Sequence, residues 1–254
     1  MTGYERIEAA GIPVVHTAAH RAAAVAMAEA VEKTVAVVAR WSLRAPPRCA
    51  VHVLTDCQEF FAQTAPRRLR PIIRLIRPLW RRRAERAFAL AGGWMMPWRG
   101  GPAVGVKPPE TLPPPGSGLG GRLFVPVPDP VEKVRHLTCH ELTHACTAHL
   151  RLPPWLNEGL AMRAVDHMAG EATVLAETRD QVRFDRSVLD SRSYRRLGAG
   201  DHDALVRLYA TGYWVTRALD EERPEVLVEL LRRRRRPREV ARTAQAALRL
   251  SQAW

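Results

Sequence analysis

The 254-residue chain lacks long apolar runs and contains only four cysteines. No stretch approaches the roughly 20 apolar residues that a membrane-spanning helix needs. The first residues, MTGYERIEAAGIPVVHT, have no charged segment followed by an apolar core, so a signal peptide is not expected. Four cysteines in a chain of this size do not form the dense pattern of a disulfide-stabilised scaffold. These absences predict a cytoplasmic protein, with peripheral membrane contact as an open alternative.

Acidic residues and lysine are also scarce. The chain has 26 acidic and 39 basic residues, only three of which are lysine, and its formal net charge is +13. A basic chain invites an anionic partner, but no zinc-finger spacing, RNA-binding signature or aromatic stacking pattern accompanies the charge. The sequence therefore does not predict nucleic-acid binding.

Hydrophobic residues make up 46% of the chain, which is long enough to bury one substantial core. We expect a single domain over residues 1–254, with a sheet-containing part over about 1–150 and a helical part over about 151–254. The pattern predicts a helix over 18–41, a strand over 49–56, and two or more strands between 94 and 128. One of these, residues 122–127, is expected to pair with earlier strands, and the Pro- and Gly-rich residues 107–121 are expected to form a long surface loop.

The segment HLTCHELTHA contains one HExxH motif, formed by His140, Glu141 and His144. Asp129 and Pro130 are typical of a helix start and place this motif on a helix. Residues four apart on a helix share a face, so the two imidazoles can bind one metal ion. Such a metal lowers the pKa of a bound water to about 7, and a carboxylate on the neighbouring face can take its proton. The motif predicts hydrolytic chemistry with Glu141 as the general base.

A third metal ligand is available in PPWLNEGLA, which begins at Pro153 and indicates the start of a second helix. Glu158 follows His144 by fourteen residues, enough for the chain to turn and bring a second helix across the metal. Gly159 and Ala161 have almost no side chain, which would let the two helices approach closely. The alternative is that Glu158 is a solvated acid in the first helical turn, where the helix dipole favours it.

Two cysteines, Cys139 and Cys146, flank the motif on its own helix. Neither lies on the face shared by His140 and His144, so we expect small buried side chains and not soft metal ligands. His136 lies one turn before His140, and we expect it to pack beside the site and not to bind the metal.

HELTH followed by WLNEGLA resembles the gluzincin metallopeptidases, and most closely their compact, peptidase-MA-like bacterial members. The resemblance is strongest over residues 131–165. It implies an α+β, zincin-like fold, in which a small twisted sheet precedes the HExxH helix and a mostly helical half follows it. It also implies a zinc cofactor, Glu158 as third ligand and a peptide or protein substrate. The metzincin pattern does not fit, because Thr147 and Leu150 stand where it needs Gly and His.

A weaker part of the resemblance covers residues 205–231 and includes Tyr209-Ala-Thr-Gly212. This stretch is similar to the Y-x-x-G helix of gluzincins, whose tyrosine hydroxyl hydrogen-bonds the oxyanion of the tetrahedral intermediate. The resemblance makes Tyr209 the candidate oxyanion donor. Tyr213, one turn further on, would share its face and is the second candidate. The alternative is that both tyrosines are core residues.

Residues from Arg67 to Arg86 form a basic amphipathic pattern. On a helical wheel the arginines lie opposite an apolar face, which contains Leu69, Ile72, Ile73, Ile76, Leu79 and Trp80. We expect the helix to begin near Pro71 and to bend at Pro78. It could pack its apolar face on the core, or it could lie on an anionic membrane surface or an acidic partner.

Two functions of different classes fit this sequence. The first is a zinc-dependent peptidase, with metal on His140, His144 and Glu158, base Glu141 and oxyanion help from Tyr209. The second is a binding protein on a gluzincin frame whose chemistry is vestigial, associated with a membrane surface through residues 67–86. No motif anchors a substrate amine, so the sequence favours an endopeptidase or a narrow processing role over an exopeptidase. It does not predict the oligomeric state.

Overall fold

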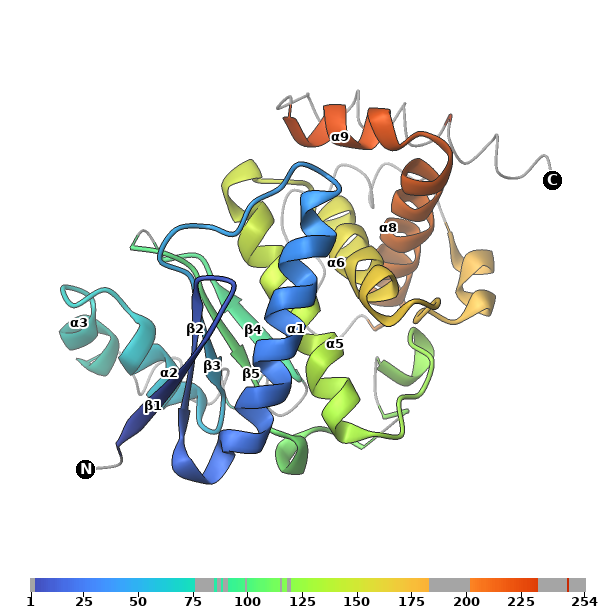
Figure 1. The fold of residues 1–254 in the computed structure, drawn as a ribbon. Coiled ribbons are helices and arrows are strands. Elements are labelled where there is room, and N and C mark those ends of the chain that lie inside the picture. The colour runs from blue at the N-terminus through green and yellow to red at the C-terminus, as the bar shows by residue number, and fades with distance from the viewer. Residues whose placement is uncertain are drawn as a thin grey trace.

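The computed structural model describes residues 3–75, 85, 88, 91–98, 100–114, 116–117, 120–182, 202–232 and 246. The described part is an α+β structure with one mixed sheet and a helical half (Figure 1). The strands are β1 (Tyr4–Ala9), β2 (Ile12–Thr17), β3 (Ala50–Val53), β4 (Gly93–Met96) and β5 (Ala103–Val106). The α-helices are α1 (Arg21–Ala39), α2 (Cys57–Thr64), α3 (Arg70–Leu75), α5 (Pro130–Thr147), α6 (Pro154–Ala169), α8 (His202–Glu222) and α9 (Pro224–Arg232). Short 3₁₀ turns cover Ala18–His20, Pro109–Thr111, Gly120–Arg122, Ala148–Leu150 and Ala176–Gln181.

The sheet has the strand order β1-β2-β3-β5-β4. Its three inner strands, β2, β3 and β5, are parallel, whereas β1 and β4 run antiparallel to their neighbours. Val14, Val51 and Val104 stand in register across the inner strands and are fully buried. Within the described residues, β1 and β4 are therefore the edge strands of the sheet.

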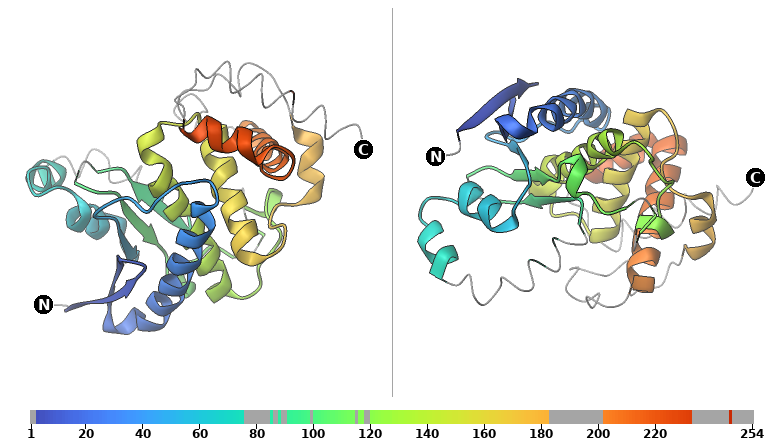
Figure 2. Two further views of the ribbon diagram at one scale, coloured as in Figure 1. Left: turned by 45° about the horizontal axis from the view of Figure 1, so that its top comes forward. Right: turned by 90° about the horizontal axis from the view of Figure 1, so that it is seen from below.

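Helices α1 and α5 lie side by side on one face of the sheet (Figure 1). Successive strand residues point to opposite faces, so Val104 and Val106 of β5 pack in the large core beneath these helices. The intervening Gly105 faces the opposite side, where the Phe60 ring of α2 packs. Figure 2 shows α2 and α3 at the end of the molecule that lies away from α8 and α9.

The helical half is built on a close crossing of α6 and α8. A Cβ atom added to Gly159 would lie 2.2 Å from the carbonyl oxygen of Gly212, and one added to Gly212 would lie 2.2 Å from the carbonyl oxygen of Trp155. Only glycine fits at these two positions, because the helix backbones nearly touch. From the sequence we expected Gly159 to let α6 approach the HExxH helix closely. This expectation was wrong, because Gly159 lies against α8.

The first two strands were not predicted from the sequence. β1 and β2 form a hairpin whose two turn residues, Ala10 and Gly11, have φ values of 47° and 75°. This is the geometry of a type I′ turn, for which Asn-Gly is the usual signature. Most residues of β1 are exposed, so it lacks the alternation of apolar and polar residues that marks a half-buried strand.

The strand predicted over residues 122–127 is also wrong. Residues 120–122 form a 3₁₀ turn, and Phe124 makes an isolated antiparallel bridge to Val174, which follows α6. The segment thus pairs with the helical half and not with an earlier strand. Its apolar residues serve a different purpose, because Leu123 is fully buried against Val206 and Ala210 of α8.

The other predicted elements are found. α1 lies within the predicted helix 18–41, β3 lies within the predicted strand 49–56, and residues 107–121 contain only 3₁₀ turns where they are described. The Asp129 carboxylate caps α5 by accepting a hydrogen bond from the backbone N–H of Val131 at 2.8 Å. None of the described helices is both long enough and apolar enough to cross a lipid bilayer.

The predicted basic helix is described only in part, as α3. It begins at Arg70, close to the expected start at Pro71. The expected bend at Pro78 and the rest of the apolar face, from Ile76 to Trp80, lie outside the described residues. At the other end of the described part, α9 is described to Arg232.

The α6–α8 crossing predicts that Gly159→Ala destabilises the protein. Alanine has the higher helix propensity, but its Cβ would overlap the Gly212 backbone and force the two helices apart. We expect the free energy of unfolding to fall by about 1–3 kcal/mol, as for other overpacked sites. Urea denaturation measures this change. Gly120→Ala is the control, because an added Cβ there meets nothing within 4 Å; equal stability of both variants and the unaltered chain would contradict the crossing.

Candidate metal centre

Three predicted ligand residues meet at the junction of α5 and α6. The Nε2 atoms of His140 and His144 lie 3.1 Å apart, and the Glu158 Oε2 atom lies 3.3 Å and 3.5 Å from them. Protein ligands bind zinc at 2.0–2.2 Å in tetrahedral geometry, which separates neighbouring ligand atoms by about 3.3 Å. The three atoms thus have the spacing of three corners of such a tetrahedron. His140, His144 and Glu158 could hold a metal ion.

The electrostatics of the three residues also suit a cation. The Glu158 side chain is only 5% exposed. Burial raises the pKa of Glu158, but His144 and His140 outweigh this effect and hold it well below its usual range. Burial lowers the pKa of His144, yet the Glu158 carboxylate more than offsets this and raises it to about 9. The alternative of a solvated first-turn acid is therefore wrong for Glu158, which is a buried anion facing two imidazoles.

Local structure explains how the three ligands converge. His140 and His144 are one turn apart near the end of α5. The chain then passes through a 3₁₀ turn to Arg151, whose φ of 52° lies in the left-handed region and reverses its direction. Pro153 and Pro154 begin α6, in which Glu158 belongs to the second turn. The reversal lays the first part of α6 across the end of α5.

Asn157 is a residue of this centre that the sequence did not single out. Its side chain lies beside the His144 ring and contributes to the raised pKa of His144. Its Oδ1 atom also accepts a hydrogen bond from the Thr147 hydroxyl at 2.7 Å. The position next to Glu158 gave no clear signal, because the contact depends on the reversal between α5 and α6.

Glu141 projects from α5 toward the edge strand β4 and not toward α6. A Cβ atom added to Gly93 would lie 2.7 Å from Glu141 Cγ and 3.3 Å from Oε1. One added to the preceding Gly92 would lie 2.6 Å from Leu137, one turn earlier on α5. The two glycines thus let α5 pack directly against β4. Burial raises the pKa of Glu141, while His144 and His140 lower it to a smaller extent.

The two candidate tyrosines have different surroundings on α8. Tyr213 is fully buried, and its hydroxyl donates a 2.7 Å hydrogen bond to the Asp166 carboxylate. Burial and Asp166 raise the pKa of Tyr213 above its usual range. Tyr209 is only partly buried and packs against two small core clusters, one that contains Leu123 and one that contains Met162. The Tyr213 hydroxyl is already engaged by Asp166.

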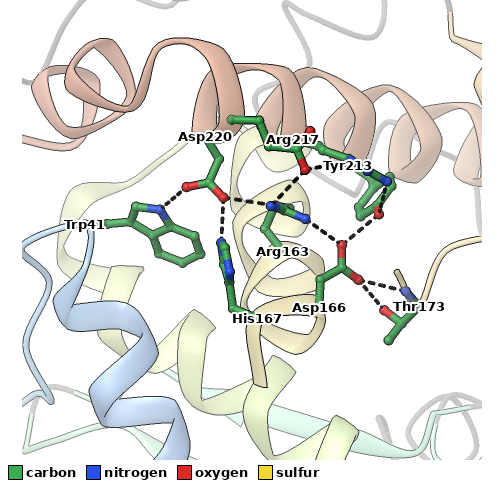
Figure 3. A network of polar contacts seen from close by, with 9 residues as sticks. Trp41, Arg163, Asp166, His167, Thr173, Tyr213, Arg217 and Asp220 are labelled. Atoms are coloured by element: carbon green, nitrogen blue, oxygen red, sulfur yellow. Dashed lines mark hydrogen bonds and ion pairs between the residues drawn. The ribbon is translucent and has the colours of Figure 1, made fainter. Parts of the chain in front are cut away.

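A buried polar network joins α6 to α8 on the other side of α6 (Figure 3). Arg163 forms ion pairs with Asp166 and Asp220, both at 3.0 Å. Asp220 also contacts His167 at 2.6 Å and accepts a hydrogen bond from the Trp41 indole at 2.7 Å. The network therefore also reaches the segment after α1, because Trp41 lies two residues beyond the end of that helix.

Each acid in this network has compensating partners. Burial raises the pKa of Asp220, but hydrogen bonds from His167 and Trp41 outweigh it and lower the pKa to about 2. Asp166 accepts hydrogen bonds from the backbone N–H and the hydroxyl of Thr173, both at 2.8 Å. Buried ion pairs need such additional hydrogen bonds to offset the loss of hydration. The network fixes α8 relative to α6 and thus relative to Glu158.

The flanking residues of the motif behave as expected. Cys139 and Cys146 are fully buried, and burial raises the pKa of each thiol to about 12. His136 is partly buried and pairs with Glu132 at 3.3 Å. Burial lowers the pKa of His136 below its usual range. Among the described residues, only His140, His144 and Glu158 form a group of three or more His, Cys, Asp or Glu side chains suited to a metal.

Comparison of the chain with models of protein families, with curated proteins and with solved structures gives no match. The chemistry of this centre is therefore argued from its own residues.

The geometry predicts one divalent metal ion per chain and its loss in Glu158→Ala. This substitution removes the only carboxylate of the three residues. We therefore expect metal affinity to fall by more than about 100-fold, which is the largest loss typical when a residue that hydrogen-bonds a metal ligand is removed. Elemental analysis after dialysis measures the metal content, and circular dichroism reports the fold. Glu177→Ala, which alters an exposed acid in the turn Ala176–Gln181, should retain the metal. Full occupancy in Glu158→Ala would show that Glu158 is not a ligand.

Proposed function

We propose that this protein is a zinc-dependent peptidase that hydrolyses peptide bonds, with Glu141 as its general base. The observation that carries the proposal is the position of Glu141, between the three potential metal ligands and the edge strand β4. A carboxylate in that place can reach both a water at the metal centre and a peptide bond beside the sheet. The order of a sheet, the HExxH helix and a helical half supports a zincin-like fold.

The set of donor atoms favours zinc over other common metals. Two imidazole nitrogens and one carboxylate oxygen form the His₂Glu set of many catalytic zinc sites. Magnesium and calcium prefer six or more oxygen ligands, which this junction does not offer within the described residues. A zinc ion bound by His140, His144 and Glu158 would act as a Lewis acid and lower the pKa of water to about 7.

Glu141 is suited to move the proton of the attacking water. Its carboxylate makes no hydrogen bond or ion pair with another described residue, so its oxygens are available to a water. Burial raises its pKa toward neutrality, which improves a carboxylate as a proton carrier. Glu141 would accept a proton from water as the water attacks the peptide carbonyl carbon. It would then donate that proton to the amide nitrogen as the C–N bond breaks.

An extended peptide is the substrate class that the neighbouring sheet supports. β4 pairs with β5 on one side only, and its other side has no strand partner among the described residues. An edge strand offers a row of free backbone N–H and C=O groups to an added strand. A peptide paired with β4 near Gly93 would pass beside Glu141, which supports endopeptidase action on a chain that extends in both directions.

Tyr209 is proposed to stabilise the oxyanion that forms during attack. Its helix, α8, packs on α6 through Gly159, the residue that follows Glu158. The partly buried ring packs against the cluster that contains Met162, and its hydroxyl would donate a hydrogen bond to the developing negative charge.

The assignment of Glu141 predicts that Glu141→Gln retains zinc and the fold but loses hydrolysis. Glutamine preserves the size and polarity of the side chain but cannot accept the proton. We expect turnover to fall by about 10²–10⁴-fold, the range for loss of general acid–base catalysis. The measurement is cleavage of a broad peptide library by zinc-loaded protein, since one unsuitable substrate would mimic inactivity.

Glu132→Gln is the matched control, because Glu132 lies on the same helix and pairs with Arg135 and His136 away from the ligands. It should cleave the library like the unaltered chain. If the unaltered chain and Glu141→Gln are indistinguishable across the library with zinc fully bound, the peptidase proposal fails. The binding protein on a vestigial frame would then be the better explanation.

The two tyrosines predict opposite outcomes for the same substitution. Tyr209→Phe should lower turnover by about 2.7–4 kcal/mol of transition-state stabilisation, with zinc retained. Tyr213→Phe should leave turnover largely intact, but it breaks a buried hydrogen bond to Asp166 and should lower stability by about 1–3 kcal/mol. Kinetics with a cleaved library peptide and urea denaturation give the two readouts. A loss of turnover in Tyr213→Phe alone would reverse the assignment.

A further inference from the structure

Three large aliphatic side chains are exposed at α3. Leu69, Ile72 and Leu75 are 39%, 52% and 80% exposed. Ile72 and Leu75 are three residues apart on α3 and therefore share one side of the helix, and Leu69 directly precedes it. An amphipathic helix normally turns its apolar side to the core, but here only Ile73 is partly buried. The packing of the apolar face on the core, one of the two alternatives for this segment, is therefore wrong for the described part.

The position of α3 is fixed by the arginine that begins it. The Arg70 guanidinium donates hydrogen bonds to the backbone carbonyl oxygens of Gln63 and Ala65, at 2.7 Å and 2.9 Å. These carbonyl groups lie in the last turn of α2 and directly after it. Without Arg70, they would lack a hydrogen-bond donor within the helix. Arg70 thus ties α3 to α2 and is not available to a partner. The exposed aliphatic side is consequently held in place before any partner binds.

The sequence on both sides of this apolar segment is strongly basic. Residues 60–84 contain eight arginines and no acidic residue. Arg67 and Arg68, which directly precede Leu69, are both exposed. A second copy of the chain would bring like charges together, which disfavours a dimer through this side. The occupant that complements both features combines negative charge with an apolar interior.

We propose that α3 docks the protein on an anionic phospholipid surface. Leu69, Ile72 and Leu75 would enter the boundary between headgroups and acyl chains, while Arg67 and Arg68 contact lipid phosphates. The contact is peripheral, because no described helix can cross a bilayer. α3 lies at the end of the molecule away from α8 (Figure 2), so docking leaves the α6–α8 junction free. The inference does not depend on the peptidase activity.

The test is sedimentation of the purified chain with vesicles at low salt. Vesicles of phosphatidylcholine and phosphatidylserine in equal amounts should bind it, and vesicles of phosphatidylcholine alone should bind it far more weakly. Binding should decrease as the salt concentration rises, because salt screens the arginines. Ile72→Ser/Leu75→Ser should weaken binding by about tenfold or more, since two exposed side chains no longer enter the lipid. Arg67→Gln/Arg68→Gln should weaken it by about ten- to thirty-fold.

Val25→Ser/Val125→Ser is the matched control, because both valines are exposed apolar residues outside α3. It should bind like the unaltered chain. Absence of binding to the anionic vesicles overturns the proposal, and so does unchanged binding of Ile72→Ser/Leu75→Ser. Light scattering without vesicles tests the other occupant: a dimer that this variant dissociates would assign the surface to a second copy. All four chains should first give the same circular dichroism and thermal unfolding.

Discussion

A buried carboxylate held against two imidazoles is the constraint on which the rest of this structure depends. Glu158 has lost nearly all contact with solvent, and an isolated charge in that place would be strongly destabilising. Its compensation comes from His140 and His144 on another helix, within 3.5 Å. The short distances from the Glu158 carboxylate to the two imidazoles are maintained only if α5 and α6 do not slide or rotate relative to each other. The reversal at Arg151 and the glycine crossing of α6 with α8 supply this restraint from two sides.

α6 therefore carries two polar clusters with different purposes. Glu158 faces α5 and the metal centre, whereas Arg163 and Asp166, further along the helix, face α8 and the buried network (Figure 3). Every charge in the network has an opposite charge or a hydrogen-bond donor beside it, so the network stabilises the packing of helices without needing a ligand. The metal centre differs, since its carboxylate and two ring nitrogens converge on one point. A cation satisfies all three at once, which a proton shared between two of them does not.

Local patterns predicted that His140, His144 and Glu158 converge, because their geometry is set within one helix and one reversal. The i, i+4 spacing of His140 and His144 fixes their shared face, and the NEG segment places Glu158 after a short loop. What failed depends on contacts between distant segments. The partner of Gly159 is 53 residues away in sequence, and Leu123 is buried by α8 and not by a sheet. The β1–β2 hairpin was missed because an exposed edge strand and an Ala-Gly turn give little signal. The resemblance to gluzincins gave the order of the elements, but it could not show that Asp166 engages the Tyr213 hydroxyl.

The faces of α5 explain how one helix can assemble this centre. Its His140–His144 face meets α6, and its Leu137–Glu141 face meets the glycines of β4. Cys139, Leu142 and Cys146 fill the core on the remaining side. Because a helix is rigid over one turn, the direction of Glu141 relative to the two imidazoles is set by the backbone and needs no further support. The distance between α5 and β4 depends on the size of the residues that face the helix. Because Gly92 and Gly93 have no side chains, the strand can contact α5 directly. Glu141 gains no described hydrogen bond or ion pair from this position, and burial raises its pKa, so its carboxylate has no electrostatic compensation there. A partly buried carboxylate with no described polar partner, beside a group that could hold a metal ion, is what the proposed role in proton transfer requires.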